Sequence, residues 1–251
     1  MKETRVYEKK LDINTNNTRK FYDERAKEIA RMECPYTSVL LGDQNPKHAE
    51  EWNIYEKEFI LPHLKIDKSS EVLDVGCGMG RWAETIIPMV SFYLGTDFSS
   101  EMIQVARKRC IFSDKDYEFY NLSFQELAQA PGTFLQERKF NRVIVSGVCM
   151  YINDSEIEQC YKGLVRLLDE HCVLFLNETV AVEKRLTLNE HPSEALKTTY
   201  DVIYRTIKEY NEYYNIFLDN GFRIEKQEFL PHLNNEKGYS ETERWYTILK
   251  R

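Results

Sequence analysis

Three glycines occur within five positions directly after the aliphatic run VLDV: Gly76, Gly78 and Gly80. Glycine loses more conformational freedom on folding than other residues, so such a cluster is expected where the backbone turns tightly or lies against a ligand. Asp97 follows Gly76 by 21 residues and ends a second β-rich run. A glycine loop followed at this distance by a carboxylate indicates a site that binds a ribose-containing ligand.

The same stretch departs from two common phosphate-binding loops. A dinucleotide fingerprint reads Gly-x-Gly-x-x-Gly, but here the third glycine comes one residue early and Arg81 stands in its place. No Gly-Lys-Ser/Thr follows, so the P-loop is also absent. The loop therefore favours a nucleoside ligand without a pyrophosphate cradle.

Short apolar runs alternate with helical stretches from residue 71, just before the glycines, to residue 250. The expected strands are 71–75, 91–97, 117–123, 140–148, 171–179, 222–230 and 244–250. The expected helices among them are 81–90, 99–110, 124–130, 154–168 and 201–220. This alternation predicts an α/β fold, a doubly wound and mostly parallel seven-stranded sheet with helices on both faces.

The flanking segments are expected to cover this core. Residues 19–31 and 48–61 have helical spacing, and Pro62 is expected to end the second helix. The first ~18 residues are polar and expected to be loosely ordered. Residues 180–199 show no clear period. We predict one domain over 1–251, with an N-terminal helical lid (1–66) and a core (67–251) that carries a substrate-lid insertion at about 180–215.

Composition narrows the class of protein. A chain of 251 residues fits one domain, and a net charge of −7 argues against a broad nucleic-acid surface. No apolar run approaches the roughly 20 residues of a membrane span, and the polar N-terminus lacks a signal-peptide centre. The six cysteines form no Cys-x-x-Cys pair. We expect a cytoplasmic protein with buried reduced thiols, no metal, and no nucleic-acid or membrane partner.

Four stretches in this order resemble the class I S-adenosylmethionine (SAM) dependent methyltransferases. They are VLDVGCGMGRW, GTDFSSEMIQVAR, FNRVIVSGVCMYI and the Gly-Phe before a late strand. The resemblance runs from about residue 70 to the C-terminus. It implies the Rossmann-like methyltransferase fold, SAM as cofactor and S-adenosylhomocysteine as product.

The resemblance also implies individual cofactor contacts. Asp74 would lie beneath the cofactor near its amino group, Arg81 would bind its carboxylate, and Asp97 would hold both ribose hydroxyls. The other implied contacts are Gly76, Gly78 and Gly80 along the methionine part, Phe98 and Met102 on the adenine, Ser123, Phe124 or Gln125 at the adenine amino group, and Ser146 and Gly147 at the sulfonium. For Phe98 and Met102, plain core packing is the alternative.

A catalytic base is needed only where the acceptor must lose a proton, as a sugar hydroxyl does. His191 is the first candidate, because its ordinary pKa suits proton removal near neutrality; a solvated loop histidine is the alternative. Glu178 is the second candidate, with a capping or salt-bridge role as its alternative. Tyr151 lies at the active-site mouth in the resemblance and is the third candidate.

The expected acceptor contacts come from the lid segments. Tyr22, in FYDERA, resembles the lid helix of small-molecule methyltransferases and would lie over the cofactor methyl, or else in the core. Tyr151 would contact the acceptor as well. Tyr204 and Arg205 could grip a phosphate or carboxylate, or else lie on a helix surface.

The N-terminal stretch from residue 38 to 64 has a looser resemblance to methyltransferases of surface-polysaccharide and sugar-modifying pathways. It favours O-methylation of a sugar-like acceptor, possibly nucleotide-linked. The alternatives are an N-methyltransferase for a small amine or a protein N-terminus, and a SAM-binding partner protein without chemistry of its own.

Overall fold

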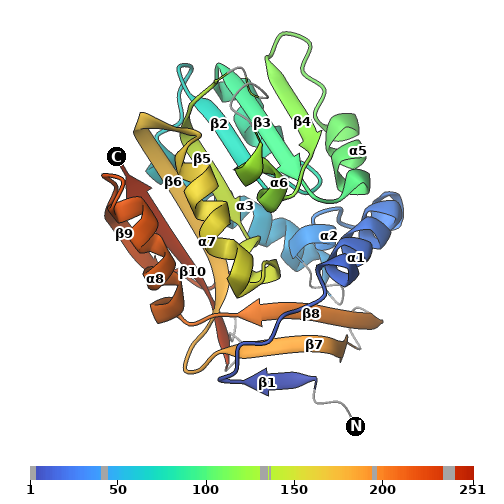
Figure 1. Ribbon diagram of the computed structural model, residues 1–251. Coiled ribbons are helices and arrows are strands. Elements are labelled where there is room, and N and C mark those ends of the chain that lie inside the picture. The colour runs from blue at the N-terminus through green and yellow to red at the C-terminus, as the bar shows by residue number, and fades with distance from the viewer. Residues whose placement is uncertain (1–3, 41–44, 131–134, 136, 194–196, 234–240) are drawn as a thin grey trace.

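The larger of two β-sheets has seven strands, and it forms the centre of the computed structural model, which describes residues 4–40, 45–130, 135, 137–193, 197–233 and 241–251 (Figure 1). In spatial order the strands are β4 (Tyr117–Asn121), β3 (Phe92–Asp97), β2 (Glu71–Val75), β5 (Phe140–Ser146), β6 (Leu168–Ala181), β10 (Thr242–Lys250) and β9 (Arg223–Phe229). The first five strands pair in parallel, whereas β10 runs antiparallel to both of its neighbours. The predicted α/β architecture is confirmed.

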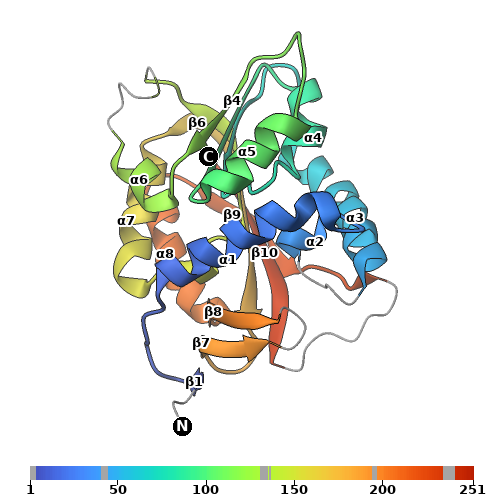
Figure 2. The ribbon, with the colours of Figure 1, turned by 90° about the vertical axis from the view of Figure 1, so that its right-hand side faces the viewer.

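Helices cover both faces of this sheet (Figure 2). One face carries α3 (Pro46–Leu64), α4 (Ala83–Ile86) and α5 (Ser100–Arg109). The other carries α6 (Phe124–Gln129), α7 (Asp154–Val165) and α8 (Ile207–Leu218). The remaining helical elements are α1 (Thr15–Glu28), α2 (Thr37–Leu40) and the 3₁₀ turns η1 (Ile29–Arg31), η2 (Ile87–Met89) and η4 (Cys149–Tyr151).

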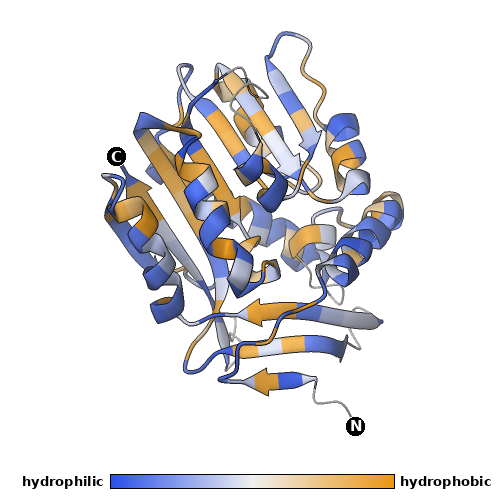
Figure 3. Cartoon of the chain, in the orientation of Figure 1, coloured by the Kyte–Doolittle hydropathy of each residue, from blue (hydrophilic) through white to orange (hydrophobic). Residues whose placement is uncertain are grey.

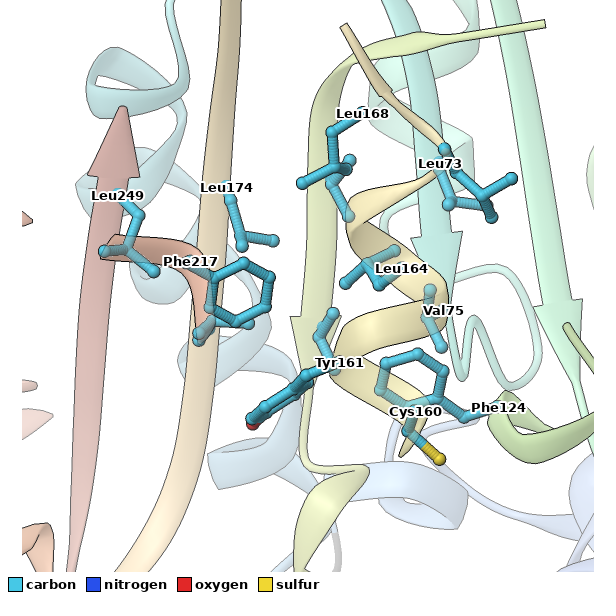
Figure 4. Packing of buried hydrophobic residues seen from close by; sticks show 14 of the residues in the cluster. Leu73, Val75, Phe124, Cys160, Tyr161, Leu164, Leu168, Leu174, Phe217 and Leu249 are labelled. Atoms are coloured by element: carbon cyan, nitrogen blue, oxygen red, sulfur yellow. The ribbon is translucent and has the colours of Figure 1, made fainter. Parts of the chain in front are cut away.

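Burial on both faces explains why the central strands are apolar without alternation. In β5, Val143, Ile144 and Val145 are all fully buried. The central strands are coloured mostly as hydrophobic in Figure 3. Leu73 and Val75 of β2 belong to the same buried cluster as Leu164 and Tyr161 of α7, and Val75 lies beside Leu164 (Figure 4). All six cysteines are buried and free, as expected.

A second, three-stranded sheet in the order β1-β7-β8 lies below the carboxyl ends of the central strands (Figure 1). Its strands are β1 (Arg5–Tyr7), β7 (Leu186–Ser193) and β8 (Thr198–Tyr204), and both pairings are antiparallel. This sheet corrects the expectation that 180–199 is irregular. It also corrects the helix expected over 201–220, because residues 201–204 belong to β8 and α8 begins only after its cap at Thr206.

Two smaller expectations for the N-terminal segment were wrong. Residues 5–7 are not loosely ordered, since Val6 and its neighbours pair with β7. Pro62 does not end α3, which continues to Leu64 and stops where Lys65 adopts a left-handed φ of 50°. Packing of Ile60 and Leu64, both fully buried, outweighs the hydrogen bond that the proline removes.

The strand order reverses at β2, which lies between β3 on one side and β5 on the other. Ligands of doubly wound sheets bind beyond the carboxyl ends of the strands at such a reversal. The loop after β2 is the glycine loop, so the fold places it where a ligand is expected.

Gly163 of α7 sets how closely that helix approaches α6. A Cβ added there would lie 2.4 Å from both the Cβ and the carbonyl oxygen of Ala128. We expect Gly163→Ala to lower the free energy of unfolding by about 1–3 kcal/mol, because the two helices must separate. Urea unfolding measures this, with exposed Gln159→Ala on the same helix as the control. Equal stability of the two variants would contradict the close packing.

Candidate functional site

A cavity of about 1110 Å³ lies at the carboxyl ends of β2, β3, β5 and β6. Side chains of α1, α3, β7 and β8 also line it. Pockets for small molecules measure roughly 300–1,000 Å³, so this one has room for a nucleoside cofactor and a second small molecule.

The glycine loop forms one end of the cavity. Gly76 and Gly78 line it with φ values of 71° and 54°, a left-handed backbone that favours glycine. A Cβ on Gly76 would lie 2.3 Å from Cγ2 of Val148, so the loop after β2 touches the loop after β5. The backbone at Gly147 is open instead, because an added Cβ would meet nothing within 4 Å.

Asp97 joins the glycine loop to the start of α5. Its Oδ2 accepts from the Gly78 backbone N–H at 2.9 Å, and its Oδ1 accepts from Ser99 N–H at 2.8 Å. Burial raises the pKa of this carboxyl to about 6, although the two backbone amides oppose that shift. Two bonds leave lone pairs of the carboxylate available, and Asp97 lines the cavity.

Asp74 lies beneath the same loop and also lines the cavity. The Tyr93 hydroxyl donates to its Oδ2 at 2.6 Å, and the carboxyl is 1% exposed. Burial raises the pKa of Asp74 to about 7.

The neighbouring wall is formed by the residues predicted to hold an adenine. Phe98 and the buried Met102 line the cavity beside Ser123, Phe124 and Gln125. Ser123 caps α6 through a reciprocal pair of hydrogen bonds with Glu126. Phe124 also packs into the core of the sheet.

Arg81 belongs to a buried polar network that ties α3 to the strand ends. Its NH1 lies 2.7 Å from Oε2 of Glu56, and both side chains are almost fully buried. Oε1 of Glu56 accepts from Nδ2 of Asn177 at 2.9 Å, and the same Nδ2 lies 3.0 Å from Oγ of Ser146. All four residues line the cavity.

Glu178 holds the turn that follows β5. Its Oε1 accepts from the backbone N–H groups of Val148 and Cys149 at 3.2 and 2.8 Å, and its Oε2 accepts from Met150 N–H at 3.1 Å. Burial raises the pKa of Glu178 to about 7 against the effect of these amides. The geometry is that of the capping role, the alternative to a base, and it fixes the turn that carries Tyr151.

Three tyrosine hydroxyls form a chain in the cavity wall. Tyr22 of α1 donates to the hydroxyl of Tyr151 at 2.9 Å, and Tyr151 is hydrogen-bonded to Tyr200 of β8. Burial raises the pKa of Tyr22 to about 12, so its hydroxyl stays protonated near neutral pH. We call the part of the cavity around these three tyrosines the chamber. The ring centroid of Tyr22 lies 6.0 Å from that of Phe98, so the chamber adjoins the glycine-loop end of the cavity.

His191 and Tyr204 line the chamber from the small sheet. His191 lies on β7 rather than in a loop, and its Nδ1 is 2.9 Å from the Thr4 hydroxyl. Burial, helped by the charge of Arg5, lowers the pKa of His191 below its ordinary value of 6.5. The imidazole is therefore neutral at pH 7 and able to accept a proton.

Comparison with known proteins agrees with this geometry. Residues 72–171 match a family model described as a methyltransferase domain. Phosphoethanolamine N-methyltransferase 1 of Caenorhabditis elegans is 22% identical over 169 residues, which are 67% of this chain and 32% of that protein. The ubiquinone biosynthesis O-methyltransferase of Pasteurella multocida is 28% identical over 130 residues, 50% of this chain and 53% of that protein.

A solved SAM-dependent methyltransferase of Leishmania major superposes with a TM-score of 0.63 at 14% identity, covering 95% of this chain and 87% of that one. This superposition shows that the chain has the fold of that methyltransferase. The chain spans 32% and 53% of the two curated relatives, so they share only part of their length with it.

Two of the predicted site residues, Gly80 and Arg205, lie outside the cavity wall. Gly80 instead packs the glycine loop against α5, where an added Cβ would lie 3.0 Å from Sγ of Cys110. Arg205 is fully buried, pairs with Asp154 at 2.8 Å and donates to the backbone oxygens of Cys149 and Ile152. These contacts occupy the guanidinium, so Arg205 supports the turn after β5 and does not grip an acceptor.

Glu56 is among the cavity residues that had not been predicted, and Tyr200 lies on β8, a strand that had not been predicted. The alternation of Tyr200, Val202 and Tyr204 with other residues has the period of a strand, and it could have indicated β8. Glu56 follows Trp52 by one helical turn on α3, so the sequence could have predicted that both lie on the same face of the helix. It could not have predicted that Arg81 is the partner of Glu56. The described residues contain no group of three metal-ligating side chains, and no helix among them is long and apolar enough to cross a membrane.

Removal of the Arg205 guanidinium should destabilise the fold. We expect Arg205→Met to lower the free energy of unfolding by about 3 kcal/mol, because two buried carbonyls and Asp154 lose their donor. Urea unfolding at pH 7 measures this change. Exposed Arg223→Met is the control and should stay within about 0.5 kcal/mol of the parent chain. Equal loss in both variants would contradict the supporting role.

Proposed function

We propose that this chain is a SAM-dependent methyltransferase that acts on a small polar acceptor. The observation that carries the proposal is the cavity itself, which joins the glycine loop and Asp97 to a chamber lined by tyrosine hydroxyls and His191. A nucleoside cofactor at the first end leaves space at the second end for the molecule that is methylated.

The residues present fit SAM. The backbone at Gly76 and Gly78 lets a ligand approach, and Asp97 keeps lone pairs for ribose hydroxyls. Phe98 and Met102 offer an apolar face for the adenine. Asp74, Arg81, Ser146 and Gly147 surround the place of the methionine part. Arg81 already pairs with Glu56, and its remaining donors are the ones assigned to the cofactor carboxylate.

When bound, SAM supplies an activated methyl group on a positively charged sulfur. The protein then has to align the acceptor and keep water out. The lid helix α1 and the small sheet close the chamber, and Glu178 holds the turn that presents Tyr151. Tyr22, Tyr151 and Tyr204 are assigned to the acceptor.

For the acceptor class we propose a sugar-like hydroxyl compound, either free or nucleotide-linked, which is O-methylated. Nε2 of neutral His191 would take the hydroxyl proton while an oxygen lone pair of the acceptor would bond to the methyl carbon. The bond from that carbon to the cofactor sulfur would break, which would leave S-adenosylhomocysteine as the product. Nδ1 of His191 lies against the Thr4 hydroxyl, which leaves Nε2 for this step. A cytoplasmic location is part of the same proposal.

Methylation of a small amine is the second candidate function. The rings of Tyr22 and Tyr151 pack edge to face, with centroids 5.6 Å apart, and offer aromatic surface to a cation in the cavity. Besides burial, the charges of Asp97 and Glu178 both raise the pKa of Tyr22, so this part of the cavity is negative. The relative from Caenorhabditis elegans is named for such a reaction. A SAM-binding protein without chemistry of its own is the third candidate, and it would bind SAM with no turnover.

The deciding experiment is a mass-spectrometric screen of the purified protein with SAM and separate pools of nucleotide sugars, small amines and N-terminal peptides. A gain of one methyl mass on a nucleotide sugar supports O-methylation. A gain only on an amine or peptide supports N-methylation. Confirmed SAM binding without a methylated product in any pool supports the binding protein.

Replacement of Asp97 tests the cofactor end directly. We expect Asp97→Ala to weaken SAM binding more than tenfold, about 1.4 kcal/mol, because the ribose hydroxyls lose their acceptor. In the parent chain, SAM affinity should fall as the pH drops below about 6, where the carboxyl becomes protonated. Calorimetric titration measures both effects, with Asp219→Ala on the surface as the control. Unchanged affinity in Asp97→Ala would refute the assignment.

A further inference from the structure

The small sheet contains a β-bulge directly before His191. In the β7–β8 pair, Leu188 lies opposite Val202, and the next pair is His191 with Tyr200. Two residues of β7, Asn189 and Glu190, therefore stand against the single residue Asp201 of β8. One extra residue on one strand is the definition of a bulge, and bulges change the direction in which later side chains point.

The extra residue decides which face of the sheet carries His191. Side chains along a strand alternate between faces, so a regular β7 would place His191 with Thr187, opposite to Leu186 and Leu188. With the bulge, His191 instead shares a face with Tyr200, its cross-strand partner. That face lines the cavity, since Tyr200 is hydrogen-bonded to Tyr151 there.

Asp201 holds this bulge in place. Its Oδ1 accepts a hydrogen bond from the backbone N–H of Glu190. Glu190 has a φ of 50°, a left-handed conformation that costs free energy in a residue other than glycine. The other oxygen, Oδ2, accepts from Nδ2 of Asn17 on α1 at 3.1 Å. A buried carboxylate, 4% exposed, thus ties the bulge to the lid helix.

We propose that Asp201 is a positioning residue for methyl transfer, because it clamps the bulge that turns His191 into the acceptor side of the cavity. The inference rests on the proposed O-methyl transfer, in which His191 accepts the acceptor proton. Asp201 has no contact with the reacting atoms in this scheme. It acts through the backbone of Glu190 and, by way of Asn17, fixes α1 over the same chamber.

The effect of Asp201 on the position of His191 can be measured without substrate, through the pKa of His191. Thr4, which directly precedes β1, and Arg5 of β1 face the imidazole from one side, and Tyr200 faces it from β8. Burial and the Arg5 charge lower the pKa of His191 in this position. An imidazole released from this face loses both effects, so its pKa should move up toward 6.5.

The first experiment is an NMR titration of His191 in the ligand-free protein. The variants are Asp201→Ala and the conservative Asp201→Asn, which keeps an acceptor oxygen for the Glu190 N–H. We expect the pKa of His191 to rise in Asp201→Ala and to stay near the parent value in Asp201→Asn. Surface variant Asp219→Asn controls for a general change of charge, and thermal unfolding confirms that each variant is folded.

The second experiment measures kcat and SAM affinity with the acceptor found in the screen. Asp201→Ala should lower kcat at least tenfold, with SAM affinity within twofold of the parent. Adding His191→Asn to Asp201→Ala should cause no further loss, because both changes remove the same function. Asp201→Asn should recover most of the rate.

Two results would overturn the inference: an unchanged His191 titration in folded Asp201→Ala, or multiplying losses in the double variant. Failure of the proposed function is a different result. If no pool is methylated, O-methyl transfer fails, while the titration still decides whether Asp201 sets the position of the imidazole.

Discussion

Buried carboxylates that accept backbone N–H groups hold the loops at the carboxyl edge of the central sheet. Asp97 does this for the glycine loop and the start of α5, and Glu178 does it for the turn after β5. Each loop would otherwise leave buried amide groups without partners, at a cost of about 1–3 kcal/mol per group. The cavity keeps its shape because these two side chains satisfy the backbone while staying inside the protein.

The two ends of the cavity are built in different ways. The glycine-loop end comes from consecutive strand-to-helix connections, so residues close in sequence meet there. The chamber end is assembled from α1, the turn after β5 and the small sheet, and the hydroxyls of Tyr22, Tyr151 and Tyr200 join these three elements. A cofactor can therefore be held by the rigid core, while the acceptor is enclosed by elements that can differ between related enzymes.

Much of the central sheet and of the glycine-loop end could be predicted. Strand burial leaves an apolar run in the sequence, and Gly76, Gly78 and Asp97 directly follow such runs. The prediction for Arg205 was wrong because the residue was expected on a helix. It directly follows β8 and is fully buried. The small sheet was missed because its bulge at Glu190 breaks the alternation that would reveal β7.

The sequence by itself determined the mostly parallel, doubly wound type of sheet, the glycine loop and the carboxylate at the end of β3. These features depend on local patterns of glycine and apolar residues. Only the tertiary structure decided that Glu56 partners Arg81, that Glu178 caps a turn, and that His191 shares the cavity with Tyr22. Those contacts join residues far apart in the chain, and their geometry depends on register, on a single extra residue in β7 and on how α1 and α3 pack.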